Sequence, residues 1–520
     1  MTNTTAHPPD GNRLNRLLGP LKLLLTPWGA LAACSLGWGL TAPFSTAPMA
    51  IGLCWWGVAL LLWSLQLERP WLEVLPFPPL TVLNLHLFLR WELGGMVLLL
   101  SRGGEGDVRV WMDHVAQALP INAVFTTGLV AAGAINWHWL HQQPKPALAG
   151  HPVQGEKAGF GKRQLLLLGV ITGFVAIGYA GVGYFGGTLD RGATYLQWAG
   201  KLWRPDTLFA ATIRLRDLYF MLLPWLVWSW RRSPAIIACF LLPTGASLLL
   251  SAVLGGRGLL LYPGLLLLGG LWLAGSRPRP LRWLIGITAI LAFVVVGALP
   301  ALRDSAAFQR TEASDLGARL EAIQAGSREL EAAQRLPLVG RDLYAWSDPY
   351  LFKEPGLSQP PAGPKRLGNL LYLWVPRALM PNRPEVNDGH LIVKEIMGTP
   401  NAGTFEGRHI WFPGISMGAD LYWRFRWPGV VTGSLLFGLL YAGFCRFWYH
   451  FADLNRNTAS ALIALYPATF LQGPPLRSLS ETAWNWLYEF PKYLLILAVV
   501  CMIVEGISRL APEQSHASEN

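Results

Sequence analysis

Charged residues are scarce in this 520-residue chain: Asp, Glu, Lys and Arg together make up 14%, whereas hydrophobic residues make up 52%. So few charges leave too much apolar surface for a soluble globular protein, and that class is excluded. The apolar residues gather instead in runs of about 20, the length at which a helix crosses the hydrocarbon core of a bilayer. The sequence therefore predicts an all-α polytopic membrane protein.

Cysteine is scarce as well, and the five cysteines all lie in or at the ends of apolar runs. A disulfide framework and a cysteine metal site are therefore not expected. The HExxH pattern is missing, and the arginines around the few histidines would repel a dication, so we expect no metal and no other cofactor. A signal-peptide layout is also lacking, and the first apolar run is expected to remain as an anchor.

About twelve apolar runs are long enough to span a bilayer. Lys and Arg in the short loops indicate the orientation, because cytoplasmic loops carry the excess of positive charge. With a cytoplasmic N-terminus, the basic clusters at 13–22, 145–163, 231–232, 277–282 and 446–456 all fall inside. The prediction is a multi-pass protein of the plasma (inner) membrane with both termini in the cytoplasm. The predicted spans are 22–42, 47–67, 77–100, 117–140, 164–187, 208–230, 234–254, 258–275, 282–301, 428–447, 458–473 and 488–508.

This topology divides the chain into three parts. Residues 1–301 form a transmembrane bundle of about nine spans, 302–427 form one large extracytoplasmic loop with surface helices, and 428–510 form about three further spans. The net charge of +11 comes largely from cytoplasmic anchors that face the anionic leaflet. A nucleic-acid partner is therefore not implied.

Arginines near the predicted outer boundary are the first candidates for binding an anionic substrate. Arg257 lies in LGGRG, a turn between two apolar runs that is short enough to hold the guanidinium at the membrane surface. The fork of an arginine matches a phosphate in two-point contact. Arg214 and Arg216 in ATIRLRDLYF are further candidates, of which one is expected to pair with Asp217 or to snorkel while the other faces the bundle.

One charged pair lies within a predicted span. Arg90 and Glu92 occur in LFLRWELGG, inside the run 77–100. Charges within a bilayer usually face the bundle and pair with one another, so a structural pair is the expected role.

The polar segment 302–427 carries the remaining candidates. In WVPRALMPNRPEVNDGH, Pro376 and Pro381 stop helix propagation and frame Arg377 and Arg383. Two arginines fixed at the lipid–water boundary would form a clamp for a diphosphate. His390 adds a side chain that changes its charge near neutral pH and is the first candidate for a general base.

A second polar group follows in TFEGRHIWFPG. Glu406, Arg408 and His409 lie there beside aromatic residues that suit sugar rings. Glu406 and His409 are alternative bases, and Arg408 is a further phosphate ligand. Shortly before the next predicted span, Arg424 is expected to face lipid headgroups.

These segments resemble one known family. VPRALMPNRPEVNDG and the later FPGISMGADLYWRFRWPGVVTGSLLFGLL are similar to motifs of the integral-membrane O-antigen and exopolysaccharide polymerases, and LGGRG resembles a turn found earlier in those proteins. The matching part runs from Leu254 to Leu440. Asp420 stands where that family commonly has glutamate, and Arg426-Trp427 replaces a usual Phe-Gly. Related O-antigen ligases share the layout.

The resemblance implies glycosyl transfer from one undecaprenyl-diphosphate-linked oligosaccharide to a sugar hydroxyl of a second, at the outer face of the membrane. Neither a nucleotide sugar nor a metal is implied. The leaving diphosphate needs fixed cations and the acceptor hydroxyl needs a base. A chain-length regulator is considered as a protein partner. The candidate cations are Arg257, Arg377, Arg383, Arg408, Arg214 and Arg216, and the candidate bases are His390, Glu406 and His409.

Three alternatives stay open. A ligase-type transferase would share the architecture and the chemistry. A transporter or flippase for polysaccharide or lipid-linked oligosaccharide would favour charges deep within helices, broken spans and internal repeats, and the sequence shows no repeat between its halves. A scaffold for envelope assembly would use the charge-balanced loop 302–427 as a protein-binding surface.

Overall fold

The computed structural model is mostly helical. It describes residues 37, 47–68, 79–100, 107–140, 162–183, 208–253, 266–267, 270, 321, 348, 351, 360–375, 379–384, 386, 395, 404–405, 408–409, 415–454 and 477–510. The helices are α3 (Ala47–Glu68), α4 (Pro79–Leu87), η2 (Phe88–Leu93), α5 (Gly94–Leu100), α6 (Asp107–Leu140), α7 (Lys162–Gly183), α9 (Leu208–Ser229), α10 (Pro234–Val253), η5 (Leu367–Tyr372), α17 (Met417–Leu454), α19 (Leu479–Trp484), η7 (Asn485–Glu489) and α20 (Phe490–Leu510).

The helical prediction is confirmed where the structure describes the chain. The predicted spans at 47–67, 77–100, 117–140, 164–187, 208–230, 234–254, 428–447 and 488–508 each coincide with helix. The spans expected at 22–42, 258–275, 282–301 and 458–473 lie outside the described residues, apart from 37, 266–267 and 270. Within the described part, Met49–Glu68 and Leu479–Arg509 are long and apolar enough to cross a membrane, and Arg163–Gly178 and Pro234–Ala246 are shorter apolar helices.

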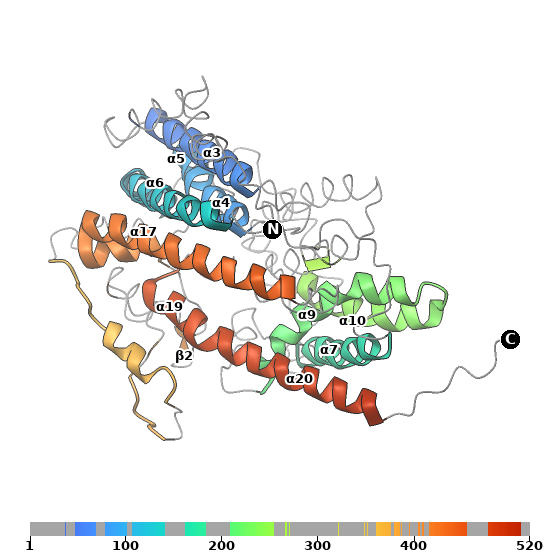
Figure 1. Ribbon diagram of the computed structural model, residues 1–520. Coiled ribbons are helices and arrows are strands. Elements are labelled where there is room, and N and C mark those ends of the chain that lie inside the picture. The colour runs from blue at the N-terminus through green and yellow to red at the C-terminus, as the bar shows by residue number, and fades with distance from the viewer. Residues whose placement is uncertain are drawn as a thin grey trace, which may run out of the picture.

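Small residues bring α6 and α17 into close contact along their lengths (Figure 1). A Cβ atom added to Gly438 of α17 would lie 2.5 Å from the carbonyl oxygen of Leu129 in α6, and one added to Gly128 would clash with Ser434. Small side chains that let two backbones approach are typical of helix packing in membranes, where no hydrophobic force drives helices together.

A sharp break divides α17 at Arg426, whose φ of 57° and ψ of −154° are not helical. A Cβ added to Gly433 would lie 2.6 Å from the Leu421 side chain. Twelve residues of unbroken helix would separate these two positions by about 18 Å. The segment before Arg426 therefore folds back onto the segment after it. Pro428 suits this break, because proline is favoured in the first turn of a helix.

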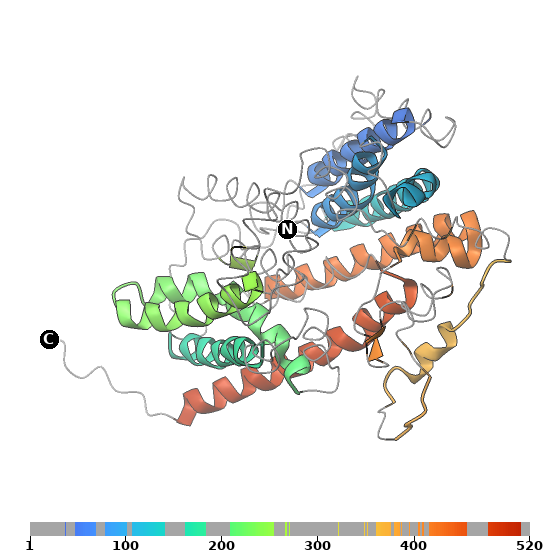
Figure 2. The ribbon, with the colours of Figure 1, turned by 180° about the vertical axis from the view of Figure 1, so that it is seen from behind.

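A second group of helices comprises α7, α9 and α10, with α20 packed against α7 and α9 (Figure 2). Gly169 of α7 lies against the side chain of Leu226 in α9. The Tyr219 hydroxyl of α9 donates a hydrogen bond to the carbonyl oxygen of Phe240 in α10. Near the far end of α20, Gln164 Nε2 donates to Ser508 Oγ at 3.3 Å.

One antiparallel ladder adds a little β structure to the helical fold. β1 (Thr404–Phe405) pairs with β2 (Arg408–His409), with Thr404 opposite His409. The surface helix expected early in the loop 302–427 lies outside the described residues, apart from Glu321.

Candidate functional site

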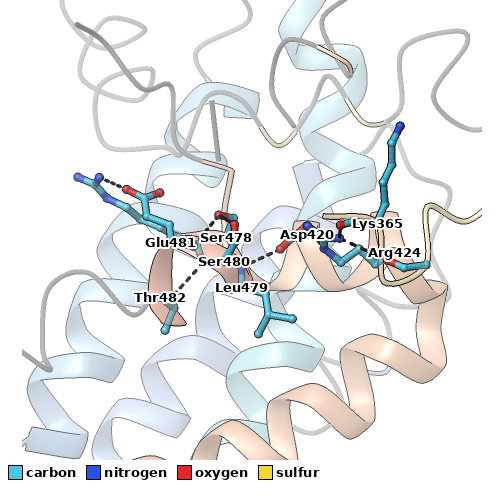
Figure 3. Close-up of polar contacts among 10 residues, drawn as sticks. Lys365, Asp420, Arg424, Ser478, Leu479, Ser480, Glu481 and Thr482 are labelled. Carbon is cyan, nitrogen blue, oxygen red and sulfur yellow. Dashed lines mark hydrogen bonds and ion pairs between the residues drawn. The ribbon is translucent and has the colours of Figure 1, made fainter. Parts of the chain in front are cut away.

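A buried ion pair ties three distant segments together at one end of the bundle (Figure 3). Asp420 and Arg424, one turn apart in α17, are both fully buried. Arg424 Nε donates to Asp420 Oδ1 at 2.9 Å, and its Nη1 donates to the carbonyl oxygens of Lys365 at 2.5 Å and Gly363 at 3.3 Å. The second carboxylate oxygen of Asp420 accepts from the Leu479 amide at 2.7 Å. The expectation that Arg424 faces lipid headgroups was therefore wrong.

The same end of α17 holds the segment 360–366 by its backbone. The amides of Ala362 and Gly363 donate to the carbonyl oxygens of Trp423 at 3.2 Å and Arg424 at 3.0 Å. Arg366, which precedes η5, has a φ of 63°. This left-handed turn directs the chain away from α17 and into the segment that carries Arg383.

The beginning of α19 forms the third side of this junction. Ser478 caps the helix, because its Oγ accepts from the Glu481 amide at 3.3 Å. The sequence Ser-Leu-Ser-Glu at 478–481 has the spacing of a capping box. The Glu481 side chain, however, forms an ion pair with Arg477 and is only 5% exposed. A buried carboxylate thus holds Arg477 at the rim of the bundle.

Asp348 links a further part of the predicted outer loop to α6 and α17. Its Oδ1 accepts from the Ser416 amide at 2.8 Å, and Ser416 Oγ lies 3.3 Å from Asn122 Oδ1. Burial raises the pKa of Asp348 to about 6, although hydrogen bonds from Ser416 and Asn122 and the positive charge of Arg90 lower it in part. A carboxyl group with a pKa near neutrality is able to exchange a proton at the pH of a cell.

Arg90 reaches this end of the bundle from η2, a π-helical turn between α4 and α5. Its charge acts on Asp348 and also on His86, one turn before it. The charge of Arg477 acts on His86 as well. Arg90 and Arg477 therefore both add positive potential at this imidazole from two separate elements. Single π-helical turns are frequent at functional sites.

Two of the predicted phosphate ligands have described side chains. Arg383 is partly buried, and its Nη1 donates to the carbonyl oxygens of Val375 and, at 3.4 Å, of Tyr372. Arg383 thus fixes the turn that follows η5. Arg216 is buried in α9, where its Nη2 donates to Asp217 Oδ1 at 2.7 Å and its Nε to the same oxygen at 3.1 Å. The pairing of one α9 arginine with Asp217 is thereby confirmed.

The other predicted site residues are described less fully or not at all. The backbone of Arg214 lies in α9, and the backbone of Arg408 and His409 forms β2. Outside the described residues lie Arg257, Arg377, His390 and Glu406. Within the described part of the chain, no group of three His, Cys, Asp or Glu side chains is arranged to hold a metal ion.

Sequence reasoning missed several members of this junction. Asp348 gave no local signal, since it acts through a contact with Ser416, 68 positions away in the chain. Arg90 was assigned a pair with Glu92, whereas the Glu92 carboxylate faces Thr126 Oγ1 of α6 at 3.4 Å. Only the Ser478 cap could have been read from the sequence.

No family model, curated protein or solved structure matches this chain.

Proposed function

We propose that this chain is a membrane glycosyltransferase that polymerises undecaprenyl-diphosphate-linked oligosaccharide repeat units at the outer face of the plasma membrane. The observation that carries the proposal is the junction at the beginning of α17 and α19. Its polar contacts join the segments 348, 360–366, 416–424 and 477–482 to the Asn122 end of α6. Every one of these segments is predicted on the outer side.

Contacts at the opposite ends of the helices also join segments that are predicted on the same side. Glu68, at the end of α3, accepts from the amides of Leu80 at 2.8 Å and Thr81 at 2.7 Å. Gln164 of α7 bonds Ser508 of α20. All of these residues are predicted at the cytoplasmic side. These contacts join segments that are predicted on one side, as a multi-pass topology requires.

The transfer needs a base for the acceptor hydroxyl and fixed cations for the leaving diphosphate. The acceptor hydroxyl attacks the anomeric carbon of the donor, the bond from that carbon to the phosphate oxygen breaks, and the lipid diphosphate leaves with the electron pair. The hydroxyl proton passes to a base, for which His390, Glu406 and His409 are the candidates. Fixed guanidinium groups offset the negative charge that grows on the diphosphate.

Arg90 and Arg477 extend the set of candidate cations for that diphosphate. The positive charges of both act on His86, and the predicted Arg377 and Arg383 follow η5 in the sequence. The Arg257 turn is the remaining predicted member. An arginine within a span is costly to hold in lipid, which supports a functional role for Arg90.

A product ladder tests the proposal. The purified protein in liposomes is incubated with the lipid-linked oligosaccharide of its own cell, and products are separated by size. We expect a ladder with the unaltered protein, and a loss of at least about tenfold in polymer with Arg477→Ala, since one fixed cation at a leaving group is worth a few kcal/mol. Arg509→Ala is the matched control, because Arg509 forms an i,i+4 pair with Glu505 at the other end of α20.

The pattern of products separates the related activities. A single addition to a lipid acceptor, without a ladder, would indicate a ligase. Equal ladders from Arg477→Ala and Arg509→Ala would remove Arg477 from the diphosphate site.

A transporter is the second candidate, and specific observations favour it. α17 is broken at Arg426, η2 interrupts the helix between α4 and α5, and Glu92 is buried with 1% exposure. Broken helices and buried charges are features of transporters. Movement of labelled lipid-linked oligosaccharide across the liposome membrane without any new glycosidic bond would establish this function instead.

A further inference from the structure

The described residues 360–375 and 379–384 project sideways from the helix bundle, at the end where α19 begins. Both ribbon views show them in yellow and orange, reaching beyond α19 and α20 (Figures 1 and 2). We name residues 367–375 and 379–384 the arm. Its root is fixed by the contacts of Arg424 with the carbonyl oxygens of Lys365 and Gly363.

The arm displays large apolar side chains to its surroundings. Leu371 is 86% exposed, Leu379 is 79% exposed and Trp374 is 59% exposed. The neighbouring Leu373 is buried, so the arm has an inner side that packs and an outer side that does not. Several large apolar groups exposed within one short segment indicate a surface that another apolar phase covers.

The arm adjoins the exposed apolar face of α20. The Trp374 ring packs edge-on against Tyr488 of η7 at 5.3 Å between centroids. Immediately beyond, α20 exposes Leu495, Val499 and Met502, which share one face of the helix. Leu479–Arg509 is one of the two described helices that are apolar enough to span a membrane. In the proposed membrane placement, this exposed face meets lipid.

Aromatic and basic side chains mark the level at which the arm joins this helix. Tyr488 packs against Trp484 at 4.6 Å between centroids, and Lys492 Nζ lies 5.1 Å from the centre of the Tyr488 ring. Trp and Tyr are enriched where a membrane meets water, and Lys extends its charge to the same level. Trp374 meets this belt from the arm.

We propose that the arm lies in the headgroup region of the outer leaflet and binds the lipid surface through Leu371 and Leu379. The two leucines insert at the boundary of headgroups and acyl chains, and the exposed Pro381 and Asn382 face the aqueous side. This rests on the membrane placement in the proposed function but not on its transfer chemistry. In consequence the Arg383 turn is held at the depth where the phosphates of a lipid-linked substrate lie.

Site-specific photocrosslinking tests the arm. Benzoylphenylalanine is introduced singly at Leu371, Leu379, Leu495 and Asn382, and each full-length variant is purified and placed in liposomes of phosphatidylethanolamine and phosphatidylglycerol. After irradiation, covalent lipid adducts are measured by mass spectrometry. The exposed positions tolerate a larger ring, and size-exclusion chromatography verifies that each variant is monodisperse. Leu495 is the positive control, because it lies on the exposed face of α20, and Asn382 is the matched polar position on the arm.

We expect lipid adducts at Leu371 and Leu379 that reach the level at Leu495 and exceed the level at Asn382 several-fold. Adducts at Leu495 without adducts at both arm positions would overturn the proposal. Crosslinks from the arm to protein in place of lipid would also overturn it, since a protein would then cover this surface. Loss of the product ladder with intact lipid adducts would contradict the transfer activity alone and leave the arm in place.

Discussion

Replacement of Arg424 by methionine tests whether the buried ion pair fixes the junction. Methionine keeps much of the apolar stem and removes the guanidinium. That guanidinium and the carboxylate of its partner Asp420 are both fully buried. The change leaves the buried carboxylate without its arginine partner, although the Leu479 amide still donates to it, and takes a donor from two carbonyl groups. Breaking a buried ion pair in this way costs about 3–5 kcal/mol of unfolding free energy.

A matched pair on the surface supplies the comparison. Arg509 and Glu505 have the same i,i+4 relation on α20 but side chains that are 76% and 53% exposed. Exposed helical pairs of this kind contribute about 0.3–0.5 kcal/mol. Arg509→Met should therefore change the unfolding free energy by less than about 1 kcal/mol.

The assay is denaturant unfolding of the purified protein in detergent, combined with limited proteolysis of the segment 360–366. Arg424→Met should lower the unfolding free energy and expose that segment to cleavage, because two of its carbonyl groups lose their donor. Asp420→Asn/Arg424→Met should be less destabilised than Arg424→Met alone, since it removes the buried charge. Equal stabilities for Arg424→Met and Arg509→Met would refute the reasoning.

Three further predictions concern other parts of the fold. Gly438→Ala should lower the unfolding free energy by about 1–3 kcal/mol, because its Cβ meets backbone of α6, whereas Gly506→Ala in α20 meets no atom within 4 Å and should not destabilise. Burial raises the pKa of Asp348 to about 6, so its contribution to stability is largest below the ordinary pKa and is lost as the pH rises through about 6. Asp348→Asn should therefore gain stability relative to the unaltered protein between pH 5 and pH 7.5, on the order of 1–3 kcal/mol. Arg426→Gly should be tolerated better than Arg426→Val, because a β-branched residue is strained at positive φ.

Each of these has a contradicting outcome. Equal melting temperatures for the two glycine variants would show that α6 and α17 separate at no cost. A pH-independent difference between Asp348→Asn and the unaltered protein would show that this carboxyl group does not titrate in the window. Greater stability of Arg426→Val than Arg426→Gly would show that the break in α17 is not strained.

The positions of the helices followed from the sequence because apolar runs of spanning length have few other stable arrangements. The start of α17 did not follow, since Asp420, Arg424 and Arg426 made its first turns look like loop. Asp420 and Arg424 are buried as an ion pair. This burial requires contacts with Gly363, Lys365 and Leu479, which a local sequence pattern cannot reveal. A charged residue in a membrane protein can therefore lie within a helix when a buried partner of opposite charge is present.

The candidate site was predictable to a different degree. The proline-framed segment around Arg383 and the cap at Ser478 carry local signals; the structure places Ser478 at the junction and Arg383 in the turn that follows η5. The contacts of Asp348 with Ser416 and of Asp420 with Leu479 join residues 68 and 59 positions apart, and no spacing rule predicts them. Tertiary contact therefore supplied the part of the site that sequence pattern could not.

The most direct test of the central claim is the release of polyprenyl diphosphate during bond formation by the purified protein. Each new glycosidic bond should release one lipid diphosphate, measured by mass spectrometry alongside the growing oligosaccharide. We expect this stoichiometry with the unaltered protein and with Arg509→Ala, and its loss with Arg377→Ala and Arg477→Ala. Transport of the lipid-linked substrate without any release of lipid diphosphate would contradict the account.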